Sequence, residues 1–147
     1  MPTVTEKLYC VLFANEENGI RGARSYAAWA HQSSDVHIAA IESDEGGFTP
    51  RGFGVTSDSI QLKQILSYRS LLDIVGADRI TTGGGGVDID QLNTKGTVRI
   101  GLTPDNQRYF DLHHSDLDTI DKVHPRELEL GSIAMAILTW CISQDGI

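Results

Sequence analysis

The chain contains the stretch Lys7-Leu8-Tyr9-Cys10-Val11-Leu12-Phe13-Ala14, which is followed directly by Asn15-Glu16-Glu17-Asn18-Gly19. The apolar run is typical of a central β-strand that other elements cover on both faces. Two adjacent carboxylates at the end of such a strand repel each other, so the pair is costly unless a cation or a proton-transfer step makes use of it. We therefore interpret Glu16 and Glu17 as a candidate general base beside a candidate metal ligand.

Beyond this stretch, segments with helical and strand-like patterns alternate along the chain. This alternation predicts an α/β fold, a three-layer α/β/α sandwich around a mostly parallel mixed sheet, as one domain over 1–147. Helix boundaries are placed by capping residues and by Pro125. The expected elements are a helix over 21–32, a strand over 36–41, a short strand over 51–56, a helix from an Asp58 N-cap to about residue 75, a short strand over 79–82, a short helix over 87–92, a strand over 97–102 and a last helix from Pro125.

Each long helix carries an apolar stripe that we expect to face the core. The two cysteines are too few for a disulfide framework or a thiolate metal site, so we expect both Cys10 and Cys141 to be buried free thiols. The stripes consist of Ile20, Ala23, Ala27 and Ala30 in the first helix, Leu62, Ile65, Leu66 and Leu72 in the second, and Leu130, Ile133, Ala134, Ile137, Leu138 and Cys141 in the last.

Composition limits the classes of partner. The chain has 147 residues, 22% of them charged, and a formal net charge of −8. An acidic protein of this size fits a soluble globular domain and is a poor match for nucleic acid or an anionic membrane surface, both of which attract basic proteins. No membrane span or signal peptide is visible in the sequence. We therefore expect no nucleic-acid partner and no membrane partner.

The carboxylates collect where a site is expected in this fold class. In open α/β sheets, ligands bind outside the carboxyl ends of the strands. Glu16, Glu17 and Asp44 all follow predicted strands, and His114 lies in a predicted loop between the last strand and the last helix. Carboxylate oxygen and imidazole nitrogen are ligands that zinc accepts. A hydrolytic site would use Glu17, Asp44 and His114 as ligands, with Glu16 as the base for a metal-bound water.

Each of these residues also has an ordinary structural interpretation. A pair of glutamates is most often solvated surface, Asp44 could cap a turn, and adjacent histidines commonly lie in a surface loop. The glycine run 83–86 lacks the following Lys-Ser/Thr of a P-loop, which excludes that motif and disfavours a nucleotide-binding domain. It could be a flexible loop or the backbone wall of a substrate cleft. Spacing alone leaves these alternatives open.

Five segments in order resemble one protein family. They are Asn15-Glu16-Glu17-Asn18-Gly19 with Gly22-Ala23, then Glu42-Ser43-Asp44, the glycine run with Val87-Asp88-Ile89, the segment Tyr109-Phe110-Asp111-Leu112-His113-His114-Ser115 through Asp118-Thr119, and Asp121-Lys122-Val123-His124-Pro125. Together they are similar to the zinc-dependent aminopeptidase and carboxypeptidase Q family, the co-catalytic di-zinc exopeptidases. The resemblance covers nearly the whole chain, from about Leu8 to Trp140.

The resemblance implies a role for each matching residue. Glu16 matches the general base, Glu17 a ligand of one zinc and Asp44 a ligand of the other, in a site that holds two zinc ions. His114 matches the histidine that shares a metal with Glu17, because it stands four residues before Asp118. The resemblance further suggests that Asp118 orients this histidine, that His113 is its neighbour, and that Tyr109 and the loop around Gly84 and Gly85 border the substrate cleft.

Parts of the family pattern are missing. The family also needs a His-x-Asp sequence and an Asp-Asp-Gly-type segment before the glutamate pair, and only residues 1–6 precede the first strand here. The chain thus resembles the C-terminal part of the peptidase domain, without the N-terminal strands of the family fold. We expect a half-site that is inactive in the isolated chain, and a sheet edge open to a missing fragment or a second copy.

Two functions remain as hypotheses. The first is a zinc exopeptidase domain that acts on terminal residues of short peptides, as an aminopeptidase or a dipeptidase. The second is a peptidase-fold remnant without catalysis that serves as an interaction or scaffold domain. The resemblance implies a secreted or extracytoplasmic location, although no leader is visible in the sequence.

Overall fold

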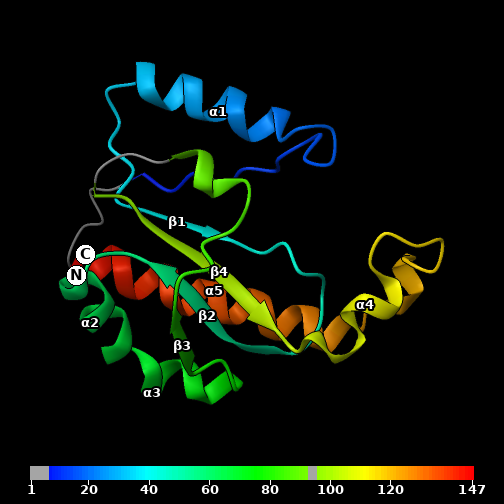
Figure 1. The fold of residues 1–147 in the computed structure, drawn as a ribbon. Helices are drawn as coiled ribbons and strands as arrows, with labels where there is room; N and C mark the ends of the chain where they lie inside the picture. The colour runs from blue at the N-terminus through cyan, green and yellow to red at the C-terminus, as the bar shows by residue number, and fades with distance from the viewer. Residues whose placement is uncertain (1–6, 93–95) are drawn as a thin grey trace.

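A computed structural model describes residues 7–92 and 96–147, and a four-stranded mixed sheet forms its centre (Figure 1). The strands β1 (Ala39–Glu42), β2 (Pro50–Thr56), β3 (Arg79–Thr82) and β4 (Val98–Pro104) lie in the order β1-β4-β2-β3. The β1–β4 and β2–β3 pairs are parallel, and the central β2–β4 pair is antiparallel. The predicted α/β class with a mixed sheet is confirmed, and its last four strands lie where the sequence pattern placed them.

Helices of very different lengths connect the strands. Among the described residues, no helix is long and apolar enough to cross a membrane. The α-helices are α1 (Arg21–Gln32), α2 (Ser59–Ser67), α3 (Arg69–Leu72), α4 (Tyr109–Leu112) and α5 (Pro125–Asp145), and the 3-10 helices are η1 (Asp73–Val75), η2 (Ile89–Leu92), η3 (Asn106–Arg108) and η4 (Ile120–Lys122).

The two faces of the sheet carry separate apolar layers. Alternate residues of a strand point to opposite faces, and in β1 Ile41 joins the main core while Ala40 packs with Ala27 and Ala30 of α1. Figure 1 accordingly shows α1 on the other side of the sheet from α2 and α3. The main core combines strand residues with residues of α2, α3 and α5, and its largest fully buried side chains are Phe53, Val55, Ile65, Leu72, Val98, Ile100 and Leu138.

The second predicted helix begins as the sequence indicates and then breaks. Asp58 and Gln61 form a reciprocal capping box at the start of α2, in which the Asp58 carboxylate accepts from the Gln61 backbone N–H at 2.9 Å. Instead of one helix to residue 75, the chain runs through α2, α3 and η1. Leu66 is 39% exposed, so its predicted core position is wrong. The break at Tyr68 interrupts the continuous stripe that one long helix would have presented.

The first and last helices follow the prediction closely. α1 spans the predicted residues, and its Ala23, Ala27 and Ala30 are buried. Pro125 occupies the first turn of α5, where the missing N–H costs nothing. The last stripe buries Ala134, Leu138 and Cys141 and leaves Leu130, Ile133 and Ile137 only partly buried.

The predicted strand over 7–14 is wrong. The segment has no regular secondary structure, no strand among the described residues pairs with it, and its Leu8 and Leu12 are 78% and 94% exposed. Cys10 is exposed for the same reason, which corrects the prediction that both thiols are buried. A continuous apolar run forms a central strand only where neighbouring strands and covering layers exist on both sides, and the described sheet ends at β1.

The glycine run 83–86 lies directly against the sheet. A Cβ atom added at Gly54 of β2 would meet the carbonyl oxygen of Gly84 at 2.7 Å, with that of Gly83 closer still. A Cβ atom at Gly101 of β4 would lie 2.9 Å from the carbonyl oxygen of Gly85. The sheet therefore has no side chains at this point because the loop backbone occupies their place.

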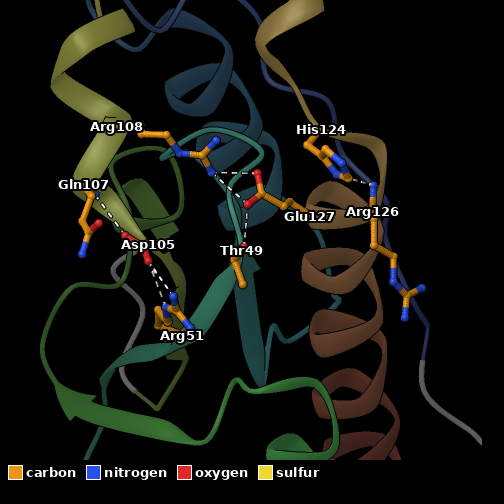
Figure 2. Close-up of polar contacts among 8 residues, drawn as sticks. All are labelled: Thr49, Arg51, Asp105, Gln107, Arg108, His124, Arg126 and Glu127. Carbon is orange, nitrogen blue, oxygen red and sulfur yellow. Dashed lines mark hydrogen bonds and ion pairs between the residues drawn. The ribbon is translucent and has the colours of Figure 1, made fainter.

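Polar contacts tie the start of β2, the end of β4 and the start of α5 together. Figure 2 shows Arg108 and Thr49 converging on Glu127, which accepts from Arg108 Nη2 at 2.8 Å and from Thr49 Oγ1 at 2.7 Å. Arg51 of β2 donates to Asp105, after β4, at 2.6 Å. Because α4 follows Arg108 directly, these contacts also anchor the segment that carries His114.

We expect Gly54→Ala to lower the free energy of unfolding by about 1–3 kcal/mol, because the added methyl group overlaps backbone atoms that cannot turn away. Gly131→Ala in α5 is the matched control. Its Cβ would meet only Leu102 Cδ2, at 3.2 Å, and alanine has the higher helix propensity. Chemical denaturation of both variants measures the effect, and equal stabilities would contradict the close approach of loop and sheet.

The Glu127 contacts predict a pH-dependent contribution to stability. Thr49 and then Arg108 hold the pKa of Glu127 below its ordinary value. A depressed carboxyl pKa adds stability that is present above the unfolded-state pKa of about 4.3 and disappears as the pH falls through the folded-state value. Glu127→Gln should therefore cost about 1 kcal/mol at pH 7 and much less near pH 3, measured by denaturation.

Glu129→Gln is the control for this experiment. Glu129 forms an exposed i,i+3 pair with Arg126, in which both side chains are more than half exposed. Such a pair contributes a few tenths of a kcal/mol. An equal loss of unfolding free energy in both variants at neutral pH would show that the Glu127 contacts stabilise the fold no more than an exposed ion pair does.

Candidate active-site cavity

An open cavity of about 420 Å³ lies beside the ends of β1 and β4 and contains most of the residues that the sequence indicated. Glu16, Glu17, Asp44 and His114 all line it. They come from the turn before α1, the segment after β1 and the segment after α4. The other residues that line the cavity are Gly46, Gly47, Phe48, Val87, Tyr109, Leu112, His113, Asp118, Lys122 and Val123.

A tight turn positions the two glutamates at the start of α1. The carbonyl oxygen of Glu16 accepts from the backbone N–H groups of Gly19 at 3.0 Å and Ile20 at 2.7 Å. Asn15 adopts a positive φ of 66°, a conformation that asparagine tolerates better than most residues, and its side chain accepts from Asn18 at 2.8 Å. These bonds hold the turn although the segment before it is not part of the sheet.

His114 also has an unusual backbone conformation. Its φ is 53°, in the left-handed region that costs energy for a residue with a side chain. The turn is closed by a hydrogen bond from the Ser115 N–H to the Leu112 carbonyl at 3.1 Å. The ring of His113 contacts both neighbouring rings, with centroid distances of 3.7 Å to His114 and 4.6 Å to Tyr109. The strained turn and the contact with the His113 ring together hold His114 at the cavity.

The contact between His114 and Glu17 is the central feature of the cavity. His114 Nε2 lies 2.7 Å from Glu17 Oε1, although the two residues are 97 positions apart. Both side chains are more than half exposed, so the contact contributes little to stability. These two residues were predicted to share one metal ion, and the fold brings them into direct contact.

Neighbouring carboxylates surround Glu16. Partial burial, followed by the charge of Glu17 and those of more distant carboxylates, raises the pKa of Glu16 above its usual range. A carboxylate with a raised pKa accepts a proton from water more readily than an ordinary one. The electrostatic setting of Glu16 is therefore suited to a general base.

Two buried acidic residues next to the cavity were not predicted as site residues. Glu42, 8% exposed, accepts backbone hydrogen bonds from Ile89 at 2.9 Å and Asp88 at 3.3 Å. Asp88 is 7% exposed, and its Oδ1 has no hydrogen-bond partner among the described residues. Burial, and then Asp44, raises the pKa of Asp88. In the sequence, Glu42 stands two residues before Asp44 and Asp88 follows the glycine run, and these positions were the only signal that they belong near the site. Their burial cannot be read from the sequence.

Gly84 and Gly85 do not line this cavity. They lie in a neighbouring open groove of about 500 Å³, which shares Asp44 and Val87 with the cavity. A Cβ atom at Gly86 would meet Glu42 Cδ at 2.6 Å, so the run also passes close to a buried carboxylate. The predicted role of Gly84 and Gly85 at a substrate cleft stays a prediction, now for the adjoining groove.

The donors fit zinc in type but not in number. A carboxylate oxygen and an imidazole nitrogen are ordinary zinc ligands, and Glu17 and His114 are in contact. No group of three or more His, Cys, Asp or Glu side chains that could hold a metal ion occurs within 7–92 and 96–147. Catalytic zinc uses three protein ligands. The described residues therefore match two positions of a coordination shell and do not complete one.

Known proteins resemble this chain in both sequence and fold. No protein-family model matches it. Carboxypeptidase Q from Bos taurus and from Homo sapiens are each 26% identical to it over 136 residues, which is 92% of this chain and 29% of those proteins. A peptidase M28 precursor from Shewanella amazonensis SB2B has a similar structure, with a TM-score of 0.80 and 24% identity over 92% of this chain and 31% of that one.

These similarities extend over nearly the whole chain but over less than a third of the relatives. The structural similarity at this identity supports the same α/β fold, and the sequence relatives are peptidases by name. The chain is therefore similar in sequence to carboxypeptidase Q, shares the α/β fold of the peptidase M28 precursor, and corresponds to one part of those longer proteins.

Proposed function

We propose that this chain carries part of the active site of a zinc-dependent exopeptidase that hydrolyses terminal peptide bonds of short peptides. The supporting observation is the 2.7 Å contact between His114 and Glu17 in a cavity that Glu16 and Asp44 also line. A hydrolase of this kind needs a base close to its metal ligands, and the fold gathers both kinds of residue from three separate segments. The relatives named carboxypeptidase Q add support at the level of the family.

Each residue has a distinct task in this proposal. Glu17 and His114 would hold one ion and Asp44 would contribute to a second, while Asp118 and His113 would keep the His114 ring in place. When zinc is bound, it supplies a water whose pKa is lowered to about 7. Glu16 takes a proton from the attacking water on its carboxylate and returns it to the nitrogen of the leaving amine. Tyr109 borders the space for the substrate.

The site needs ligands beyond those described. The relatives extend far beyond the part that this chain matches. We propose that the His-x-Asp and Asp-Asp-Gly-type segments, which the family resemblance requires, belong to such a part and would supply the remaining ligands. The chain by itself is then expected to bind zinc weakly and to show little or no peptidase activity, since two protein ligands fall short of three.

A second candidate function is favoured by the surface around β1. The segment 7–14 exposes Leu8 and Leu12, and Val36 before β1 is 85% exposed. Apolar side chains beside an unpaired sheet edge are typical of a surface that pairs with another chain. The alternative is thus an interaction or scaffold domain whose partner, a fragment of the same peptidase domain or a second copy, adds strands at β1.

Two further properties come from the same reasoning. The net charge of −8 argues against a nucleic-acid partner and against binding to anionic membranes. A location outside the cytoplasm is proposed from the family resemblance alone.

Zinc binding tests the ligand assignment in the isolated chain. We expect weak binding in calorimetric titration, reduced at least tenfold in His114→Ala and in Glu17→Gln because each loses one of two donors in contact. His31→Ala, an exposed histidine in the last turn of α1, should bind zinc as the wild type does. Two tightly bound zinc ions per wild-type chain, or unchanged binding in His114→Ala, would contradict the assignment.

Loss of the base tests the catalytic proposal. Joined to the remaining segments of a peptidase domain from a relative, the chain should hydrolyse dipeptide or aminoacyl substrates. Glu16→Gln should lower kcat by at least 100-fold while leaving metal content unchanged, because the amide cannot accept the proton. Glu45→Gln, an exposed carboxylate that does not line the cavity, is the control. Normal turnover in Glu16→Gln would contradict the role of Glu16 as the general base.

A further inference from the structure

The acidic cavity contains one strongly basic side chain, Lys122. Among the described residues that line it, Lys122 is the only lysine or arginine, and Glu16, Glu17, Asp44 and Asp118 are all acidic. An ammonium group cannot ligate a metal ion, so it has no part in the proposed zinc site. In a chain with a net charge of −8, such a group is the feature of this cavity that attracts an anion.

Local structure holds Lys122 at the cavity wall. It ends η4, where its N–H donates to the Thr119 carbonyl at 2.9 Å. Its Nζ lies 3.0 Å from Asp121 Oδ2, and the other oxygen of Asp121 accepts from the Thr119 hydroxyl. An ammonium has three N–H donors, and Asp121 uses one of them. The Lys122 side chain is 45% exposed and lines the cavity, so part of it is open to a ligand there.

The rest of the cavity limits what that ligand is. Phe48, Val87, Leu112 and Val123 provide apolar walls between the charged groups. Its volume of about 420 Å³ lies at the lower end of the ~300–1,000 Å³ range of small-molecule sites. A cavity of that size with separate acidic and basic groups suits a short zwitterion better than the middle of a long polypeptide.

We propose that Lys122 binds the free C-terminal carboxylate of a short peptide in this cavity. The inference rests on the proposed peptidase function and adds to it the residue that selects a free carboxylate. The acidic residues then face the opposite, amino-terminal part of the same peptide. Without Lys122, the described lining has no lysine or arginine to offset the acidic residues, and these repel a carboxylate.

Binding of two matched ligands to the intact chain tests this inference directly. The dipeptide Ala-Ala and its C-terminal amide differ at the group that Lys122 is proposed to bind. NMR titration of the wild-type chain should show binding of the free acid roughly tenfold tighter than of the amide, as one charge-assisted contact implies. Lys122→Gln should abolish this preference, and Lys122→Arg should retain it.

Lys63→Gln provides the control, because Lys63 is an exposed lysine on α2 that does not line the cavity. It removes the same charge from the chain and should keep the preference for the free acid. Retention of the preference in Lys122→Gln, its loss in Lys63→Gln, or absence of binding by the wild type would each overturn the inference. Lys122-dependent binding in a protein that never hydrolyses peptides with zinc would overturn the proposed function and leave the inference standing.

Discussion

The parallel pairing of β1 with β4 is the constraint on which the candidate site depends. Because the two strands run in the same direction, their carboxyl ends meet at one edge of the sheet. The chain leaving β1 carries Asp44, and the chain leaving β4 leads through η3 and α4 to His114. An antiparallel pairing of the same strands would put these two loops at opposite ends of the sheet. The antiparallel β2–β4 pair then holds β4 in the centre of the sheet.

Unusual backbone conformations help to direct side chains into the cavity. Asn15, which precedes the predicted base Glu16, and the predicted ligand His114 both have positive φ. Strain of this kind persists only where the surrounding structure enforces it. Around His114 that support comes from the His113 ring and from the Arg108–Glu127 contact at the base of α4. The site is therefore held by the loop structure rather than by the weak, exposed contact between His114 and Glu17.

The cavity combines groups that attract opposite charges. Its acidic side suits cations, whether a metal ion or an ammonium group, and Lys122 provides a single basic point within it. Buried Glu42 is compensated by two backbone N–H groups, whereas Asp88 Oδ1 has no such compensation among the described residues. Burial, followed by the charge of Asp44, accordingly raises the pKa of Asp88.

The sequence by itself determined the α/β class, the bounds of α1, the start of α5 and the residues gathered at the sheet edge. These features depend on local signals: a 3.6-residue apolar period, a capping box, a proline at a first helical turn and carboxylates after apolar runs. Only the tertiary structure decided that Leu8 and Leu12 of the segment 7–14, Cys10 and Leu66 are exposed. Burial depends on whether other segments of the chain pack over a residue. The tertiary structure likewise decided that Glu17 and His114 are in contact and that Lys122 shares their cavity. Contacts across nearly 100 residues arise from strand pairing and loop closure, which leave no local pattern in the chain.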